Sequence, residues 1–310
     1  MILTVTTNPC VDKTVFIDAL EPGAKIRAPK CTCIPGGKGN NVSRAVKALG
    51  YETAAFNILA GRAGQHVADM ITEQDGVRCI PVWVSGMTRT ITTVLEEPIH
   101  RQTALFEPGP QLTEEEVAAV AETFRGVIGE ARVVTFNGAV PCVSLQPLYR
   151  DLIRIAHEAG VLTVLDTYGP ELALGLEARP HMVKPNDVEA AGLVGFPLDS
   201  RDAQWRAIEA LHGRGVPCVV LSLGADGALV SAHGEQLHAV PEPIETINPV
   251  GSGDALVAAF AIGLQEGWPL TEMARMGVAA GTANAMSWDI GHFTRAEVER
   301  VAEHVHILPR

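Results

Sequence analysis

The strongest chemical signal in the sequence is a glycine-rich turn that leads directly into an apolar helix. The turn reads NPVGSGD at 248–254, and the helix is expected over 255–264. Gly251 and Gly253 let the backbone approach a ligand and leave N–H groups unpaired at a helix N-terminus, which suits an anion. Asp254 would repel a phosphate bound there, unless it takes a proton from the group that attacks that phosphate. The alternative is that Asp254 only stabilises the helix dipole, and an isolated GSGD would favour that alternative.

A second glycine-rich turn, PGGKGNN at 35–41, also leads into a helix. It is not a P-loop, because Gly39 stands where Ser or Thr must hold magnesium. It is not a dinucleotide fingerprint either, because the third glycine is missing. Two such helix entrances, far apart in the sequence, suggest two polar substrates that meet between two helix N-termini.

The charge distribution favours small anions over nucleic acids. The 310 residues include 36 acidic and 24 basic side chains, for a net charge of −12. A phosphate-backbone binder with a basic surface is therefore not expected. The first sixty residues nevertheless carry seven basic and four acidic side chains, which form either a local anion-attracting patch or a solvated face. Arg89 could add a bidentate grip on a phosphate, a contact worth about 1.5–3 kcal/mol.

Two weaker motifs lie further along the chain. SLGADG at 222–227 ends a predicted parallel strand, where open α/β sheets bind ligands, although a plain turn fits equally well. KPNDVE at 184–189 places an amide and a carboxylate at a helix start, which suits water-mediated magnesium. Alone, that motif would be just a capped helix.

Several classes of protein are not expected. The chain has no run of 18 apolar residues, and its N-terminus lacks the basic region of a signal peptide. We therefore expect a soluble cytoplasmic protein with no membrane or nucleic-acid partner. The six cysteines form no Cys-x-x-Cys pair and the ten histidines show no metal spacing, so neither a disulfide scaffold nor zinc is expected.

Helix and strand patterns alternate almost to the end of the chain, which predicts one α/β domain over 1–310 with a mainly parallel sheet covered on both faces. Thr113 and Glu116 form a capping box at one helix start, and Thr294 and Glu297 open another. The predicted strands are 2–7, 133–136, 161–166, one ending near Lys184, and 218–223; the predicted helices include 40–49, one from Thr113, one ending at Gly160, 255–265, 270–286 and 295–305.

Two segments, 10–34 and 85–107, break this alternation. Neither shows a helical period, and the second alternates as a hairpin around Pro98. They predict a small antiparallel sheet added to the α/β body. It could be a lid, an oligomer contact or both; the alternative is a decorative surface hairpin.

Together and in this order, the motifs resemble the ribokinase-like (PfkB) sugar kinase family, in the branch that holds 1-phosphofructokinase and tagatose-6-phosphate kinase. The resemblance covers TxNPxxD at 6–12, 36–50, Thr88-Arg89, 184–187, 222–228 and 248–255. It implies a three-layer α/β/α fold with a small antiparallel β lid, a homodimer through that lid, and ATP and Mg²⁺ as cofactors. It leaves a dependence on a monovalent cation open.

The resemblance also implies roles for individual residues. Asp254 would be the base that deprotonates a sugar hydroxyl, and the backbone N–H groups of 251–254 (Gly251, Ser252, Gly253 and Asp254) would stabilise the transferred phosphoryl group. The other implied sites are the sugar site (Asp12, Gly36, Gly37, Lys38, Asn41), the grip on the substrate's phosphate (Arg89, with Lys25 and Arg27 reaching across a dimer), the nucleotide site (Lys184, Asn186, Ser222, Gly224, Gly227, Asn284), and magnesium held through water by Glu189 and Asn186.

Two departures leave the substrate open. Residues 137–141 read NGAVP where relatives have SGSLP, and Thr7 replaces a leucine. The leading hypothesis is a kinase that converts fructose 1-phosphate or tagatose 6-phosphate to the bisphosphate. The alternatives are a kinase of fructose 6-phosphate, of an unphosphorylated sugar or of a nucleoside, and a sugar-phosphate sensor without turnover. A dinucleotide-dependent oxidoreductase lacks its glycine fingerprint.

Overall fold

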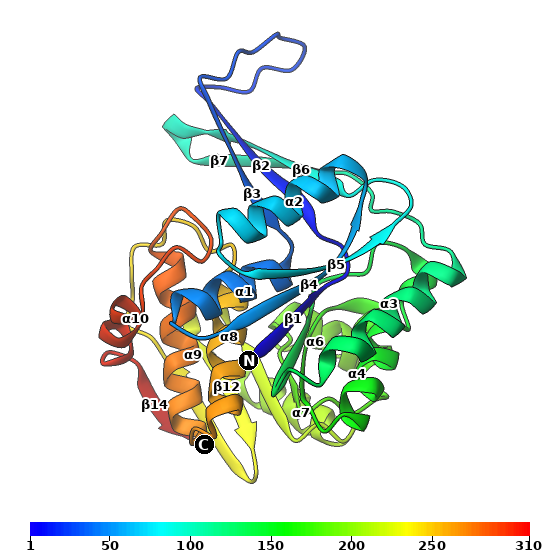
Figure 1. Cartoon of the computed structure of the whole chain (residues 1–310). Coiled ribbons are helices and arrows are strands. Elements are labelled where there is room, and N and C mark those ends of the chain that lie inside the picture. The colour runs from blue at the N-terminus through cyan, green and yellow to red at the C-terminus, as the bar shows by residue number, and fades with distance from the viewer.

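The computed structural model describes residues 1–310, which form a large twisted sheet with helices on both faces and a small sheet standing off one edge (Figure 1). The large sheet has the strand order β14-β13-β12-β11-β10-β9-β8-β1-β4-β5. Its strands from β5 to β11 are parallel, and β12, β13 and β14 continue it antiparallel. The predicted mainly parallel sheet is confirmed.

The strands of the large sheet are β1 (Ile2–Thr6), β4 (Thr53–Ala60), β5 (Arg78–Val84), β8 (Val133–Asn137), β9 (Leu162–Asp166), β10 (Met182–Val183), β11 (Cys218–Ser222), β12 (Ala228–Ala232), β13 (Glu235–Val240) and β14 (His306–Pro309). The helices are α1 (Lys38–Ala48), α2 (Gly61–Glu73), α3 (Glu114–Ile128), α4 (Leu148–Glu158), α5 (Gly169–Leu176), α6 (Asp187–Val194), α7 (Arg201–His212), α8 (Ser252–Glu266), α9 (Leu270–Ala285) and α10 (Arg295–Ala302).

The sheet separates two large apolar cores. Leu3 and Val5 of β1 point into the core that α3, α4 and α7 cover, while Ile2 points into the core under α1, α8 and α9. A strand buried on both faces reads as a continuous apolar run, which explains the predicted strand at 2–7. Helix α8 is buried over residues 254–263 because α1, α9 and the sheet surround it.

The small sheet, called the lid below, consists of β3 (Lys30–Gly36), β2 (Cys10–Ile17), β6 (Arg89–Glu96) and β7 (Arg101–Phe106), in that order. Both hairpins, β2–β3 and β6–β7, are antiparallel, and the pair β2–β6 that joins them is parallel. The predicted hairpin turn at Pro98 is a single turn of 3-10 helix. The loop 18–29 between β2 and β3 extends far from the body (Figure 1).

The sequence did not predict every element. It missed β4, α2 and β5 at one edge of the large sheet, helix α5, and the strands β12, β13 and β14 at the other edge. Both capping boxes are present at the helix starts where they were expected, at Thr113 and Thr294. No helix in the structure combines the length and the apolar character needed to cross a bilayer.

Two helical glycines test the packing of this fold with the same substitution. A Cβ on Gly277 in α9 would lie 2.5 Å from the Phe260 ring of α8, whereas a Cβ on Gly126 in α3 would contact nothing within 4 Å. We expect Gly277→Ala to lower the free energy of unfolding by about 1–3 kcal/mol through overpacking. Gly126→Ala should instead raise it by about 0.5–1 kcal/mol. Urea unfolding of both variants measures the difference, and equal effects would contradict the α8–α9 packing.

Candidate active site

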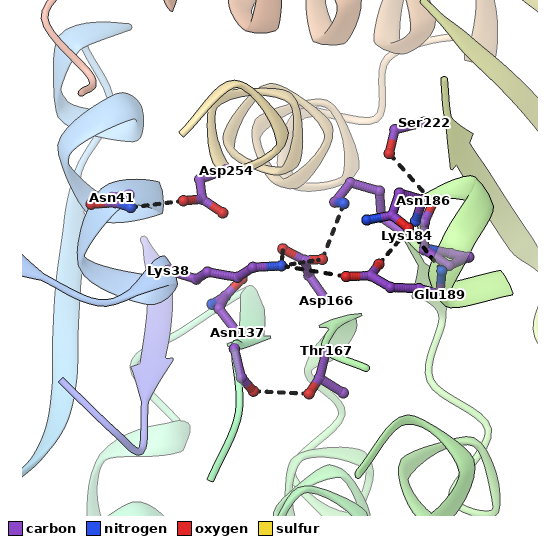
Figure 2. Close-up of polar contacts among 12 residues, drawn as sticks. Lys38, Asn41, Asn137, Asp166, Thr167, Lys184, Asn186, Glu189, Ser222 and Asp254 are labelled. Carbon is purple, nitrogen blue, oxygen red and sulfur yellow. Dashed lines mark hydrogen bonds and ion pairs between the residues drawn. The ribbon is translucent and has the colours of Figure 1, made fainter. Parts of the chain in front are cut away.

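The polar residues of the candidate site follow the carboxyl ends of the parallel strands. Asn137 and Asp166 end β8 and β9, Lys184 follows β10, and Ser222 ends β11. Parallel strands all end at one edge of the sheet, so residues distant in the sequence gather there. Figure 2 shows these side chains facing a common space between α1 and the start of α8.

The two glycine-rich turns meet at this edge. Gly37 caps α1 with a φ of 112°, and Gly251 caps α8 with a φ of 84°, values that favour glycine. Asn41, in the first turn of α1, donates from Nδ2 to Asp254 Oδ2 at 2.8 Å (Figure 2). The expectation that two helix entrances face one another is therefore confirmed.

Asp254 lies in an environment suited to accepting a proton. Its side chain is only 5% exposed. Burial raises the pKa of Asp254 to about 6, and the negative charge of Asp166 adds to this effect. Lys38, the Asn41 amide and Lys184 oppose the rise. Asp254 is thus ionised at neutral pH yet more basic than an ordinary aspartate, as a general base requires.

The backbone in front of Asp254 offers hydrogen-bond donors. The N–H groups of Gly251, Gly253 and Asp254 have no acceptor within the chain, whereas that of Ser252 donates to Pro249 O at 3.2 Å. A Cβ on Gly253 would lie 3.5 Å from Lys184 Nζ, so an ammonium group is close to this turn. The arrangement can stabilise an anion.

A carboxylate that the sequence analysis missed lies at the centre of the site. Asp166 is fully buried and accepts from Lys38 Nζ at 3.4 Å and from Lys184 Nζ at 3.1 Å (Figure 2). Burial alone would raise the pKa of Asp166, but Lys184 and Lys38 outweigh it and hold the pKa below its usual value. An aspartate at the carboxyl end of the predicted strand 161–166 was the only signal available.

The predicted magnesium residues are partly used by local structure. Asn186 caps α6: its side chain accepts from Glu189 N at 2.8 Å, and its N–H donates to Glu189 Oε2 at 2.9 Å. Glu189 Oε1 is 4.0 Å from Lys38 Nζ and faces the site beside Asp166. These two carboxylates are the hard oxygen donors that Mg²⁺ prefers, and Mg²⁺ usually keeps several waters. The residues therefore fit a water-mediated magnesium ion, with Asn186 positioning Glu189.

The predicted sugar-site residues on the lid face the same region. Asp12 on β2 lines a cavity of about 80 Å³ that Val250, in the glycine-rich turn 248–254, also lines. Burial raises the pKa of Asp12, against the effects of Arg44 and Arg89. Arg89 donates from NH2 to Asn8 O at 3.1 Å, and its buried Nε has no partner. NH1, which is neither bonded to the protein nor among its buried unpartnered atoms, is therefore the nitrogen of Arg89 that can reach a ligand.

Other predicted residues are placed differently. Lys25 and Arg27 lie in the exposed loop 18–29, away from the site of their own chain. A Cβ on Gly36 would lie 2.8 Å from Asp12 Cβ, so Gly36 is needed for close packing of the lid strands. Gly227 is required because its φ is 77° and a Cβ would collide with Ala239 O, whereas Gly224 faces open space.

Asn284, predicted to bind nucleotide, braces the anion-binding turn. Its Nδ2 donates to Val250 O at 2.8 Å and lies 3.3 Å from Ser252 Oγ, while its Oδ1 accepts from Gly291 N at 2.8 Å. All hydrogen-bonding atoms of this amide are therefore engaged by the protein itself. Asn284 shapes the turn rather than offering a free amide to a ligand.

The two departures at 7 and 137–141 belong to one network. Thr7 Oγ1 donates to Ala139 O at 3.3 Å and lies 2.9 Å from Tyr149 Oη. Tyr149 Oη donates to Asn137 O at 2.9 Å. The Thr7 hydroxyl thus supports the backbone of the loop that lost two serines.

Comparison with known proteins identifies the family. The model of the pfkB family carbohydrate kinases matches residues 5–287. The chain belongs to this PfkB family. PfkB enzymes are ATP-dependent kinases, and the ribokinase-like fold expected for them is confirmed by the solved structures.

Three PfkB relatives illustrate the likeness. A 1-phosphofructokinase of Xanthomonas campestris pv. campestris is 33% identical over 98% of this chain and 97% of its own. A tagatose-6-phosphate kinase of Staphylococcus epidermidis is 29% identical over 99% of both. The structure of phosphofructokinase-2 from Escherichia coli in complex with potassium has a TM-score of 0.90 and 28% identity over 97% of this chain and 98% of that one. A tetrameric inhibited form of that relative matches similarly.

The pKa of Asp254 gives a prediction for pH dependence. Only the ionised carboxylate can accept a proton, so kcat/KM should fall as the pH drops through about 6, with a slope of one on a logarithmic plot. Steady-state rates between pH 4.5 and 8, in buffers of constant ionic strength, measure this limb. A limb near pH 4 would show that burial does not control the ionisation of the base.

Proposed function

We propose that the protein transfers the γ-phosphoryl group of ATP to a hydroxyl of a phosphorylated ketohexose, with Asp254 as the base. The observation that carries this proposal is the position of Asp254: a buried carboxylate at a helix entrance with free N–H groups, hydrogen-bonded across the site to Asn41. The likeness to fructose-1-phosphate and tagatose-6-phosphate kinases supports the substrate class.

The chain's own residues supply each step of the transfer. Asp254 accepts the hydroxyl proton as the oxygen attacks the γ-phosphorus of ATP, while the bond from that phosphorus to the β,γ-bridging oxygen breaks and ADP leaves. The N–H groups of Gly251 and Gly253 stabilise the negative charge of the phosphoryl group. The ammonium groups of Lys38 and Lys184, fixed by Asp166, add positive charge beside this turn. When bound through Glu189 and Asp166, Mg²⁺ would neutralise charge on the nucleotide phosphates.

Arg89 distinguishes a sugar-phosphate kinase from a kinase of neutral sugars. Its NH1 group, which no protein acceptor engages, and its position beside Asp12 support a grip on the substrate's phosphate. Lys25 and Arg27 would join it only from the lid loop of a second copy, since they lie far from their own site. A homodimer through the lid is therefore part of the proposal, and the exposed Leu105 and Phe106 on β7 give it an apolar surface. The E. coli relative was solved in complex with potassium, so the activity of this protein should also be measured with and without a monovalent cation.

The role of Asp254 can be separated from a helix-dipole effect. We expect Asp254→Asn to lower kcat by about 10²–10⁴-fold while ATP binding and the melting temperature stay close to wild type. Glu272→Gln, at the first turn of α9, is the control because it removes the same charge from a helix start outside the site. Coupled assays of ADP release measure both variants. Near-native turnover of Asp254→Asn would contradict the base assignment.

A substrate screen tests the acceptor. ADP release should be fastest with fructose 1-phosphate or tagatose 6-phosphate, slower with fructose 6-phosphate, and slowest with free sugars. Arg89→Ala should raise KM for the sugar phosphate by about tenfold or more, because it loses a charge-assisted contact worth about 1.5–3 kcal/mol. Its KM for a neutral sugar should hardly change. Binding of sugar phosphate without any ADP release would instead indicate a sensor.

A further inference from the structure

Arg44 lies within the 36–50 motif but has been given no role of its own, and all five of its N–H donors are engaged. Nε and NH2 bind the two oxygens of Asp75 at 2.9 Å each, and NH2 also donates to Pro35 O at 3.0 Å. NH1 donates to Asn41 Oδ1 and to Ile290 O, both at 3.3 Å. Its side chain is 13% exposed. One guanidinium therefore joins α1, the segment that follows α2, the lid and the loop near 290.

The bond to Asn41 decides which end of that amide faces the base. Asn41 and Arg44 are three residues apart on α1 and so lie on one face of the helix. Arg44 holds the amide oxygen of Asn41, which leaves the NH2 group to donate to Asp254. If the amide turned over, its oxygen would face the carboxylate and the hydrogen bond would be lost.

The other bonds fix the two glycine-rich turns. Pro35 directly precedes Gly36, where the lid strand enters α1. Ile290 packs so closely on Gly251 that a Cβ there would collide with its side chain. Arg44 thus binds backbone carbonyls on both sides of the site. Pro35 O belongs to the glycine-rich turn 35–41, and Ile290 packs against the glycine-rich turn 248–254.

We propose that Arg44 is a positioning residue for phosphoryl transfer, which acts through Asn41 on Asp254 and through Pro35 and Ile290 on the two turns. The inference rests on the proposed function, in which Asp254 is the base. Lysine cannot replace Arg44, because an ammonium group has three donors and cannot match the planar five-bond arrangement.

A cavity makes Arg44 open to chemical rescue. A cavity of about 740 Å³ is lined by Arg44 together with Asp75, Met286 and Phe293. A small guanidinium compound can enter it, and Asp75 remains to bind that compound when the Arg44 side chain is removed.

The test compares Arg44→Met, Arg44→Lys and Arg44→Ala with Arg150→Met. Arg150 is the control because it is also partly buried and bound to two carboxylates, Asp151 and Glu177, on a distant helix. We expect Arg44→Met to lower kcat by about 100-fold, as small misplacements of reacting groups do, with little change in KM for ATP. Millimolar methylguanidine should restore part of the activity of Arg44→Ala, and Arg150→Met should behave as wild type.

The pH profile separates positioning from a structural role. The groups that face Asp254 are Lys38, Asp166, Lys184 and Asn41. Only Asn41 changes its contact in Arg44→Met, and losing its donor disfavours the ionised carboxylate. The acidic limb of kcat should therefore move to higher pH. Thermal melting of each variant is measured alongside. If Arg44→Met does not fold, Asp75→Asn replaces it in the test, and we expect a smaller shift of the acidic limb in the same direction.

The outcomes are distinct. Wild-type kcat and pH profile in Arg44→Met, or a loss of activity with neither a shifted limb nor methylguanidine rescue, would overturn the role of Arg44. Asp254→Asn is measured in the same assay. If that variant stays active, the proposed function itself fails; if it is inactive while Arg44→Met is normal, only the present inference fails.

Discussion

The site depends on a balance of buried charge. Two buried carboxylates, Asp166 and Asp254, lie beside the ammonium groups of Lys38 and Lys184. Buried charges are costly unless they are paired and hydrogen-bonded, so neither carboxylate is stable there alone. The pairing is unequal: Asp166 contacts both lysines directly, whereas Asp254 is bonded to a neutral amide. The pKa values move apart for that reason, and one carboxylate stays a fixed anion while the other can exchange a proton.

The fold places positive electrostatic potential next to the two buried carboxylates. The carboxyl ends of the parallel strands and the N-termini of α1 and α8 converge on the same space. Each helix entrance contributes partial positive charge and free N–H groups. Glycine is required at both entrances, since Gly37 and Gly251 have positive φ and neighbouring groups leave no room for a side chain. The same turns therefore bind anions and let the lid and the loop near 290 approach closely.

The sequence predicted what depends on local pattern. Buried strands, capped helices and glycine-rich turns each leave a short signature, and the Pro98 hairpin and the α8 entrance were predicted from theirs. Asp166 leaves no signature, because one aspartate after an apolar strand is common and its lysine partners lie far away in the sequence. Arg44 is visible as a neighbour of Asn41 on one helix face. Its other acceptors are Pro35, nine residues earlier, and Asp75 and Ile290, farther along the chain, so only the tertiary structure shows that one side chain joins them.

The two departures at 7 and 137–141 belong to one hydrogen-bond network at the carboxyl edge of the large sheet, outside the lid. The Thr7 hydroxyl contacts Ala139 O and Tyr149 Oη. It therefore stabilises the backbone of the loop 137–141 and is not available to a ligand. The amide of Asn137 donates to Thr135 inside the sheet. The Thr7 hydroxyl and the Asn137 amide nitrogen are therefore used by the protein itself, while the basic side chains of Lys38 and Arg89 lie next to this segment. Under the proposed function, a substrate on this side of the site would meet basic side chains rather than these engaged groups, which favours an anionic substrate over a neutral one.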